Sequence, residues 1–199
     1  MDHIVVSEVE VKTIIMSLKP KNSTGYDGIP NKILKYSIHT ISKPLTCIYN
    51  HSLTTGIFPE RSKFAIVWPI YKTGGGKKKI SNYRPISIPS VIPKILEIIM
   101  FGRLEQHLES NNILATEQYG FMKGAHIENE IFILTDNILI ALNQRQQVGG
   151  IFCDITKAFD SVNHSILLNK LYYYGIRGKC HHWFKSKLEN RGLVYRHTF

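Results

Sequence analysis

The sequence predicts an α+β protein whose N-terminal part is helical. Three observations lead to this expectation. Apolar residues recur at helical spacing over the first quarter of the chain, β-branched and aromatic segments follow at 64–70 and 84–88, and helical spacing then returns at 93–108 and 128–147. Hydrophobic residues make up 43% of the 199 residues and charged residues 20%. This composition provides a core of ordinary domain size.

The N-terminal quarter predicts three helices. A capping box that begins at Ser7 predicts a helix over 8–18. Pro30 fits the first turn of a second helix, where a missing N–H costs nothing. Pro44 is expected to open a third helix that stops at Gly56.

A β-hairpin is expected next. Residues 22–30 are rich in Gly, Asn, Ser and Asp and predict a loop. Residues 64–70 predict a strand, and 84–88 predict the strand that returns beside it. The connection over 71–83 holds three consecutive glycines and then three lysines, which indicates a positively charged hairpin tip.

The rest of the chain alternates predicted helices with one strand. Helices are expected from Pro93 through Leu108, over 128–147, from an Asn163 cap to Gly175, and around Trp183. The inward stripe of the second of these is predicted to be Ile131, Leu134, Ile138 and Leu142. Residues 151–155 form a short apolar run with period-two alternation and predict a buried strand. No repeat or linker divides the chain, so one domain, or one and a piece, is expected.

The net charge is strongly positive. Lys and Arg outnumber Asp and Glu by 25 to 15, which favours a polyanionic partner such as nucleic acid but also occurs in proteins kept soluble by charge. No apolar run is long enough to span a bilayer, and residues 1–12 do not resemble a secretory signal. Three widely spaced cysteines indicate a reduced protein. An intracellular location, nuclear or cytoplasmic, is therefore expected, with no membrane association.

A candidate metal-binding carboxylate lies within residues 150–160. Asp154 falls at the end of the predicted strand and directly before a turn, where a carboxylate can hold a divalent ion at the edge of a sheet. Magnesium bound in this way keeps several waters and uses one or two carboxylates together with substrate phosphates. The alternative is that Asp154 only caps the turn through its side chain.

Four sequence blocks of the chain are informative when taken together. In chain order they are Asn22-Ser-Thr-Gly-Tyr-Asp-Gly-Ile-Pro30, Asn82-Tyr-Arg-Pro-Ile-Ser87, Glu117-Gln-Tyr-Gly-Phe121 and Phe152-Cys-Asp-Ile-Thr-Lys-Ala-Phe-Asp-Ser-Val-Asn-His164. In this order they resemble the reverse transcriptase of non-LTR (LINE-type, jockey-like) retrotransposons. The resemblance implies part of a right-hand polymerase fold. Its expected divisions are a helical N-terminal extension at 1–60, fingers at 61–148 and the start of the palm at 149–199.

The resemblance also implies roles for individual residues. Asp154 matches the first metal-binding carboxylate of the palm, with the Ile155 backbone carbonyl as a second ligand to one of two magnesium ions. Phe159 matches the aromatic residue beneath the nucleotide sugar, the alternative being a core aromatic residue. Lys72 and Arg84 match groups that hold the incoming triphosphate, for which their charge is suited.

Two further groups have alternatives that the sequence leaves open. Gln118, Gly120 and Phe121 resemble a block near the template and nucleotide, although Phe121 could equally be a core residue. The three lysines of the hairpin tip could contact a phosphate backbone or could form a solvated loop. They are Lys77, Lys78 and Lys79. The adjacent Cys180-His181-His182 lacks the ligand spacing of a zinc site.

The sequence departs from the family in its acidic residues. No Asp-Asp pair occurs in the 199 residues, and Glu189 is the only acidic residue after Asp160. We therefore expect a truncated, catalytically incomplete RNA-directed DNA polymerase, with RNA template, DNA primer and deoxynucleotides as partners. The alternative is a non-catalytic nucleic-acid-binding remnant. Because an incomplete palm leaves an unpaired strand, association through the exposed palm edge is also expected.

Overall fold

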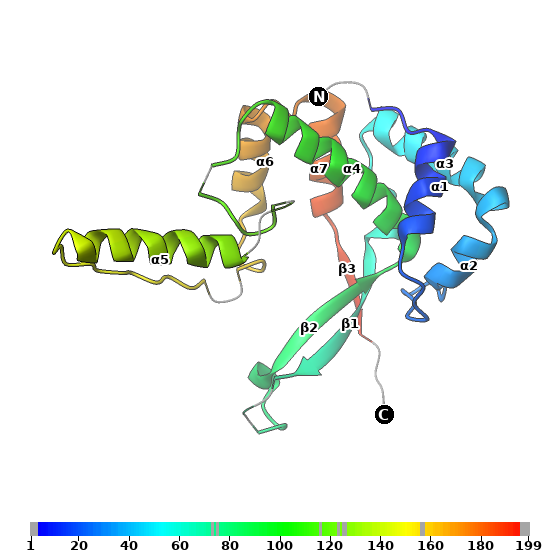
Figure 1. The fold of residues 1–199 in the computed structure, drawn as a ribbon. Coiled ribbons are helices and arrows are strands. Elements are labelled where there is room, and N and C mark those ends of the chain that lie inside the picture. The colour runs from blue at the N-terminus through cyan, green and yellow to red at the C-terminus, as the bar shows by residue number, and fades with distance from the viewer. Residues whose placement is uncertain are drawn as a thin grey trace. The chain divides into compact units, whose positions relative to one another are not determined.

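The computed structural model is a mixed helix and strand structure, as the α+β prediction requires (Figure 1). It describes residues 4–72, 74, 76–115, 117–122, 124, 127–155 and 158–195. The chain forms two compact units, of which unit 1 comprises Met1–His107 and His164–Phe199, and unit 2 comprises Leu108–Asn163. Unit 1 is thus built from two parts of the chain that are distant in sequence. Among the described residues, no helix has the length and apolar character needed to cross a membrane.

The predicted first helix is confirmed as α1, Glu8–Ser17. The Ser7 hydroxyl accepts a hydrogen bond from the Glu10 backbone N–H at 3.1 Å, which satisfies one of the free donors of the first turn. Val11 and Ile15 are fully buried on the inner face of α1. Ser42 and Lys12 donate hydrogen bonds to Glu8, and the one from Lys12 is the larger cause that lowers the pKa of this carboxyl. The cap and the apolar spacing therefore specify this helix as the sequence indicates.

The prediction that Pro44 opens a helix is wrong. The helix α2 spans Asn31–Tyr36, and α3 spans Ile38–Thr55 with Pro44 in its interior. Proline lacks one backbone donor, but burial of Leu45, Tyr49 and other side chains of α3 compensates for the lost hydrogen bond. The predicted stop at Gly56 is confirmed, since Gly56 adopts a left-handed φ of 71°.

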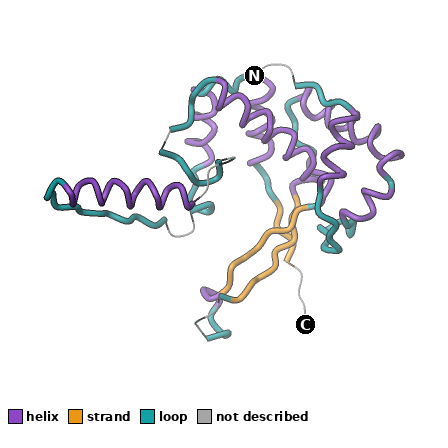
Figure 2. Tube along the Cα trace, in the orientation of Figure 1, coloured by secondary structure: helices purple, strands orange, loops and turns teal. Residues whose placement is uncertain are grey.

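The predicted hairpin is confirmed, and the structure adds a third strand to it. Strands β1 (Phe64–Tyr71) and β2 (Tyr83–Pro89) pair in antiparallel register from Ala65 opposite Pro89 to Tyr71 opposite Tyr83. Strand β3 (Gly192–Tyr195) lies parallel to β1, so the sheet order is β2-β1-β3 (Figure 2). The sequence gives no signal for β3 because four residues are too few to show an alternating pattern.

Three helices complete unit 1. They are α4 (Val91–Ser110, of which the part up to His107 belongs to unit 1), α6 (His164–Tyr173) and α7 (Gly178–Leu188), close to the predicted positions. Trp183 of α7 is the largest fully buried side chain, and its ring meets that of Phe58 edge to face at 5.3 Å. Its indole N–H donates to the Ser52 hydroxyl at 3.0 Å, and Ser52 donates in turn to the Ile57 carbonyl at 2.6 Å. These contacts attach α7 to α3.

Unit 2 contradicts the predicted strand over 151–155. The helix α5 spans Ile127–Asn143, one residue earlier than the predicted start and four residues short of the predicted end, but 151–155 form no strand and the side chains of Ile151 and Phe152 are 93% and 89% exposed. A strand requires a partner for its backbone donors and acceptors, and the described residues provide none here. The edge position expected for association is therefore not formed by this segment.

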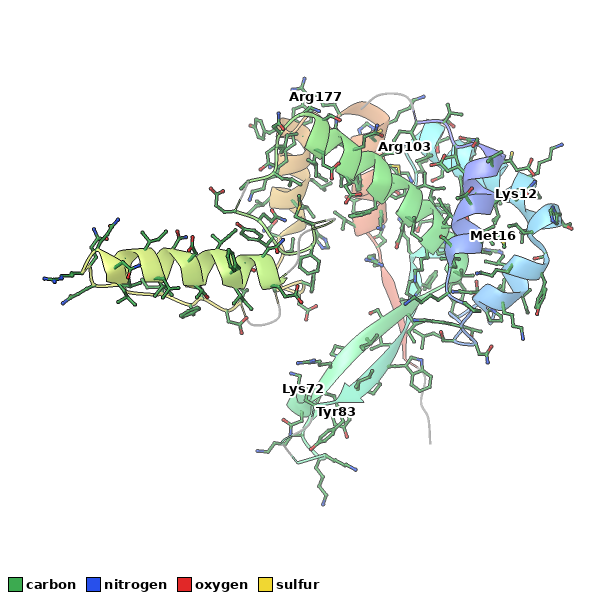
Figure 3. All side chains as sticks on the ribbon, in the orientation of Figure 1. Lys12, Met16, Lys72, Tyr83, Arg103 and Arg177 are labelled. Carbon is green, nitrogen blue, oxygen red and sulfur yellow. The ribbon has the colours of Figure 1, made fainter. Side chains whose placement is uncertain are left out.

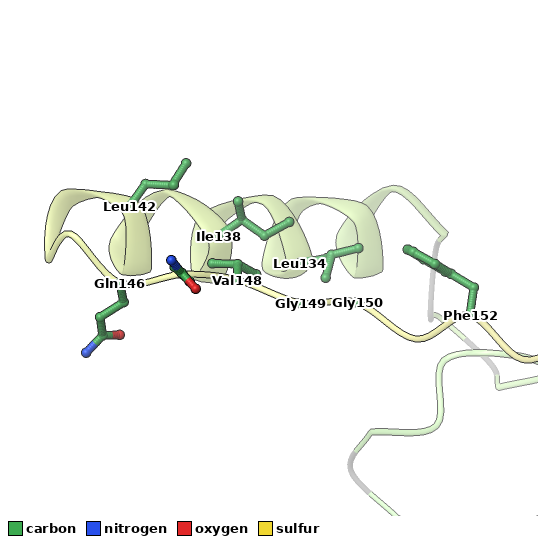
Figure 4. Close-up of a pocket in the computed structure, with 9 residues that line it drawn as sticks. Leu134, Ile138, Leu142, Gln146, Val148, Gly149, Gly150 and Phe152 are labelled. Atoms are coloured by element: carbon green, nitrogen blue, oxygen red, sulfur yellow. The ribbon is translucent and has the colours of Figure 1, made fainter.

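The apolar face of α5 is largely uncovered. Ile131, Leu134 and Leu142 of the predicted inward stripe are 57%, 48% and 56% exposed. Leu134, Ile138 and Leu142 line an open hollow together with Val148 and Phe152 (Figure 4). The stripe is therefore correctly placed on one face, but this face packs only loosely within unit 2.

Replacing Trp183 tests the packing of unit 1. We expect Trp183→Phe to lower the free energy of unfolding by about 1–3 kcal/mol, because it removes a buried donor and leaves space in the core. Denaturant unfolding followed by circular dichroism measures this change. Trp68→Phe, at the other tryptophan and on a half-buried strand position, is the matched control and should cost less than about 1 kcal/mol. Equal effects of the two substitutions would contradict the assigned role of Trp183.

Candidate functional site

The loop over residues 22–30 fastens the base of the hairpin. The Asp27 carboxylate accepts hydrogen bonds from the Ile29 N–H at 3.2 Å and from the Ser90 hydroxyl. Gly25 lies so close to Ser90 that an added Cβ would come within 2.6 Å of its Cα, which explains the glycine. The loop is thereby held against the junction of β2 and α4.

Tyr26 attaches the same loop to the beginning of β1. Its hydroxyl donates to the Arg61 backbone carbonyl, and its ring lies 5.8 Å from the ring of Phe64, edge to face. The first of the four sequence blocks therefore contacts both the start of β1 and the residue that follows β2. Its position determines where the two strands leave the helical part of unit 1.

The second block orders the tip of the hairpin. Lys72 N–H donates to the Asn82 carbonyl at 2.7 Å, and the Asn82 side-chain amide donates to the Gly76 carbonyl at 2.8 Å. The Tyr83 hydroxyl donates to the Lys77 carbonyl at 2.9 Å. Side chains of Asn82 and Tyr83 thus fold the loop that carries the lysines.

The hairpin presents a positively charged surface (Figure 3). We call this surface the basic hairpin; it consists of Lys72, Lys77, Lys78, Lys79 and Arg84. All five side chains are exposed, and none of them forms an ion pair with a described residue. The sequence contains no Asp or Glu between Glu60 and Glu97, so nothing in this segment neutralises the charge. The structure thus brings these five predicted residues together on one element.

Two tyrosines that the sequence analysis did not single out accompany these charges. The rings of Tyr71 and Tyr83 meet edge to face across the strands, with their centres 5.5 Å apart, and the Lys77 ammonium lies 6.0 Å from the centre of the Tyr71 ring. Aromatic rings among exposed cations are typical of surfaces that bind single-stranded nucleic acid. The sequence could have indicated this pair, because Tyr71 and Tyr83 stand at the two ends of the predicted hairpin connection.

In unit 2, two predicted aromatic residues meet. The rings of Phe121 and Phe159 lie 6.0 Å apart, edge to face. They are 89% and 80% exposed, so the alternative that they are core residues is wrong. Phe121 adopts a left-handed φ of 62°, and the Gln118 amide donates to the Gly120 carbonyl at 3.4 Å in the same turn. Unit 2 therefore offers an exposed aromatic pair beside a polar turn.

Asp154 does not occupy the predicted sheet edge. It lies in the unpaired segment of unit 2, and its side chain and that of Ile155 are exposed. Within the described ranges, no three or more His, Cys, Asp or Glu side chains come together as a possible metal site. One carboxylate and one carbonyl do not make the two-metal arrangement, which needs further carboxylates. The residues present thus do not complete the implied magnesium site.

The comparisons with known proteins identify the family. A family model described as reverse transcriptase (RNA-dependent DNA polymerase) matches residues 75–198. The chain belongs to this family. Its relatives are reverse transcriptases of non-LTR retrotransposons, which confirms the resemblance read from the four blocks. Reverse transcriptases generally use divalent metal ions.

The relatives are much longer proteins than this chain. The probable RNA-directed DNA polymerase from transposon BS of Drosophila melanogaster is 32% identical over 94% of the chain, which covers 20% of that relative. The RNA-directed DNA polymerase from mobile element jockey of Drosophila funebris is 30% identical over 81% of the chain, or 18% of the relative. The chain thus spans about a fifth of the length of these reverse transcriptases.

Removing the Asp27 carboxylate tests the anchor of the hairpin. We expect Asp27→Ala to destabilise the protein by about 1.5–3 kcal/mol, because the hydrogen bonds from Ile29 and Ser90 to a charged acceptor are lost. Urea unfolding provides the measurement. Asp136→Ala, on the exposed face of α5, serves as the control and should change stability by less than about 0.5 kcal/mol. An unchanged urea midpoint for Asp27→Ala would show that the loop is held by other contacts.

Proposed function

We propose that this chain is the nucleic-acid- and nucleotide-binding part of an RNA-directed DNA polymerase of a non-LTR retrotransposon. The observation that carries the proposal is the basic hairpin, whose five cations are exposed and whose Lys77 ammonium lies 6.0 Å from the centre of the Tyr71 ring, one of a tyrosine pair. This combination suits an RNA template beside a DNA primer, since cations contact the phosphates of both strands and rings stack on unpaired template bases. The family match supports RNA as the template.

The proposal assigns the chain to part of a right-hand polymerase fold. Residues 1–60 would form the helical N-terminal extension, 61–148 the fingers and 149–199 the start of the palm. Support for this division comes from the order of the four blocks and from the family match over 75–198.

Within this fold the hairpin would contact the incoming deoxynucleotide. Lys72 and Arg84 would hold the triphosphate, where ammonium and guanidinium groups balance oxygens that gain charge during phosphoryl transfer. Their exposure and their lack of ion pairs with described residues support this role. Lys77, Lys78 and Lys79 would contact the phosphate backbone.

Unit 2 would contribute the aromatic and acidic groups. Phe159 would lie beneath the nucleotide sugar, and Gln118, Gly120 and Phe121 would lie near the template. The exposed ring pair of Phe121 and Phe159 supports this assignment because most of each side chain remains accessible to a ligand. Asp154 would provide the first carboxylate, with the Ile155 carbonyl, for divalent metal ions that neutralise charge on the phosphates.

The same proposal holds that these 199 residues bind without polymerising. No Asp-Asp pair occurs among them, so the remaining carboxylates of a two-metal site would have to come from another polypeptide segment. This also leaves a second candidate function, a non-catalytic nucleic-acid-binding remnant, which the basic hairpin would support equally. The two candidates differ only in whether added carboxylates restore synthesis.

Salt dependence of RNA binding tests the basic hairpin. We expect the triple substitution Lys77→Ala, Lys78→Ala, Lys79→Ala to reduce the log–log salt slope by about 2, at roughly 0.7 for each single-strand phosphate contact. Fluorescence anisotropy with a labelled single-stranded RNA at several salt concentrations gives the slope. The matched control replaces three exposed lysines elsewhere, Lys19, Lys21 and Lys43, and should leave the slope unchanged. Equal slopes for the two triple variants would sink the assignment.

Primer extension distinguishes the two candidate functions. The assay joins this chain to the segment that follows the matched region in the transposon BS relative, and supplies an RNA template, a DNA primer, deoxynucleotides and magnesium. We expect no extension by the chain alone and extension by the chimera, with a loss of about 100-fold or more in Asp154→Asn. Asp160→Asn is the control and should retain activity. A chimera that binds RNA but never extends the primer would favour the non-catalytic remnant.

A further inference from the structure

A second exposed aromatic and cationic surface lies on α6 and α7, and it shares no residue with the surfaces described above. Four rings follow one another there in edge-to-face contacts. Tyr173 lies 6.2 Å from Tyr172, Tyr172 lies 5.8 Å from His181, and His181 lies 6.4 Å from His182. We call these four rings the ring ladder. None of the four belongs to a buried core cluster, and the His181 ring also hydrogen-bonds to the Leu168 carbonyl of α6 at 3.1 Å.

The ring ladder is open to solvent. Tyr173 is 82% exposed and Tyr172 is 48% exposed, and His182 is exposed as well. The Arg177 guanidinium lies 5.0 Å from the centre of the Tyr172 ring, in cation–π geometry. A planar base that stacks on Tyr173 would therefore find a planar cation, the Arg177 guanidinium, beside the neighbouring Tyr172 ring.

The segment that carries the ring ladder contains basic but no acidic residues. Residues 161–188 contain five Lys or Arg and three His but no Asp or Glu. Lys187 pairs with Glu97 at 3.2 Å, and Lys185 lies 3.9 Å from Glu189. The three others, Lys170, Arg177 and Lys179, are exposed and form no ion pair with a described residue. These cations are available to an anionic ligand.

The beginning of α7 adds backbone donors to these charges. Its N-cap residue, Arg177, makes no side-chain capping hydrogen bond, and the first turn holds no acidic residue. The N–H groups of that turn and the positive end of the helix dipole suit a phosphate. The guanidinium of Arg177 lies at the same helix end.

We propose that the ring ladder, with Arg177, Lys170 and Lys179, is a second binding surface for single-stranded nucleic acid. Exposed tyrosine faces take stacked bases, and the three cations with the α7 N-terminus take the phosphates. An acidic polypeptide would match the charge but would leave the row of rings without planar partners. The inference rests on the proposed function only for the class of ligand, because its residues and contacts are separate from the basic hairpin.

Two substitutions on this surface test the proposal in the whole chain. We expect Tyr173→Ala to weaken binding of a labelled single-stranded RNA about fivefold or more, with the salt slope unchanged, because stacking is lost and no charge is removed. Arg177→Gln should lower the salt slope by about 0.7, because one phosphate contact is lost. Unchanged thermal unfolding of both variants shows that the fold is retained.

The chain offers a matched control pair on α2. There the Lys32 ammonium lies 5.9 Å from the centre of the Tyr36 ring, and Tyr36 is 78% exposed. This pair has the same chemistry but no neighbouring ladder of rings. Tyr36→Ala and Lys32→Gln should leave affinity and slope unchanged. Equal losses for the two pairs, or wild-type binding by Tyr173→Ala and Arg177→Gln, would overturn the proposal.

Two more binding measurements distinguish a nucleic-acid surface on the ring ladder from an acidic-polypeptide site and from binding by the basic hairpin. Unlabelled polyglutamate should displace the RNA far less well than unlabelled RNA of equal charge, and equal displacement would instead identify an acidic polypeptide as the ligand. The triple lysine variant of the basic hairpin is measured in parallel. If only the hairpin variant weakens RNA binding, the proposed function stands and this inference is contradicted. If only the ring-ladder variants weaken RNA binding, this inference stands and the role proposed for the basic hairpin is contradicted.

Discussion

Burial of Trp183 against α3 is the contact on which unit 1 depends. It brings a helix from the C-terminal part of the chain into a core formed by α1, α3 and α4, where its indole N–H donates to the Ser52 hydroxyl and Ser52 donates to the Ile57 carbonyl. A second bond, from the Phe58 N–H to the Ser186 hydroxyl at 3.1 Å, holds the next turn of α7. Gly56 allows this approach, since an added Cβ would come within 2.8 Å of the Lys179 carbonyl. Burial of a large aromatic ring with a satisfied polar group thus connects two distant parts of the chain.

A few hydrogen bonds connect the hairpin to this core. Tyr26 and Asp27 hold the loop over 22–30 against the start of β1 and the end of β2. Tyr49 of α3 donates a hydrogen bond to the Ile92 carbonyl, at the start of α4, at 2.8 Å. Burial raises the pKa of Tyr49, which keeps its hydroxyl a donor. The strands can therefore extend into solvent while their bases stay fixed. A surface that must contact a long polyanion gains from such a rigid base.

Sequence patterns predicted correctly those helix ends and strands that depend on residues close together in the sequence. The Ser7 cap, the Gly56 stop and the paired strands of the hairpin could be read directly because each depends on neighbouring residues. Pro44 was misplaced because tertiary burial of α3 outweighs one missing donor. The strand over 151–155 was wrong because an alternating pattern cannot supply a pairing partner.

For the candidate site, the sequence identified the charged residues but not the contacts between side chains. Lys72, Arg84 and the three tip lysines were found from composition and from the motif, and the structure places them on one hairpin. Contacts between residues far apart in sequence, such as the ring pair of Phe121 and Phe159, leave no periodic signal. The row of rings on α6 and α7 was missed because its central contact, between Tyr172 and His181, joins two different helices. Recognition of the family depended on four ordered blocks, since no single block was specific.

The parallel pairing of β3 with β1 has a consequence for the order of folding during synthesis. Strand β1 and the helix α3 leave the ribosome long before α7 and β3 have been made, so their apolar faces wait for partners from the C-terminal part of the chain. Unit 1 therefore cannot close co-translationally from its N-terminal segment alone. Nascent chains that stop before α7 should expose the unsatisfied surface around Phe58 and Ser52 and recruit chaperones.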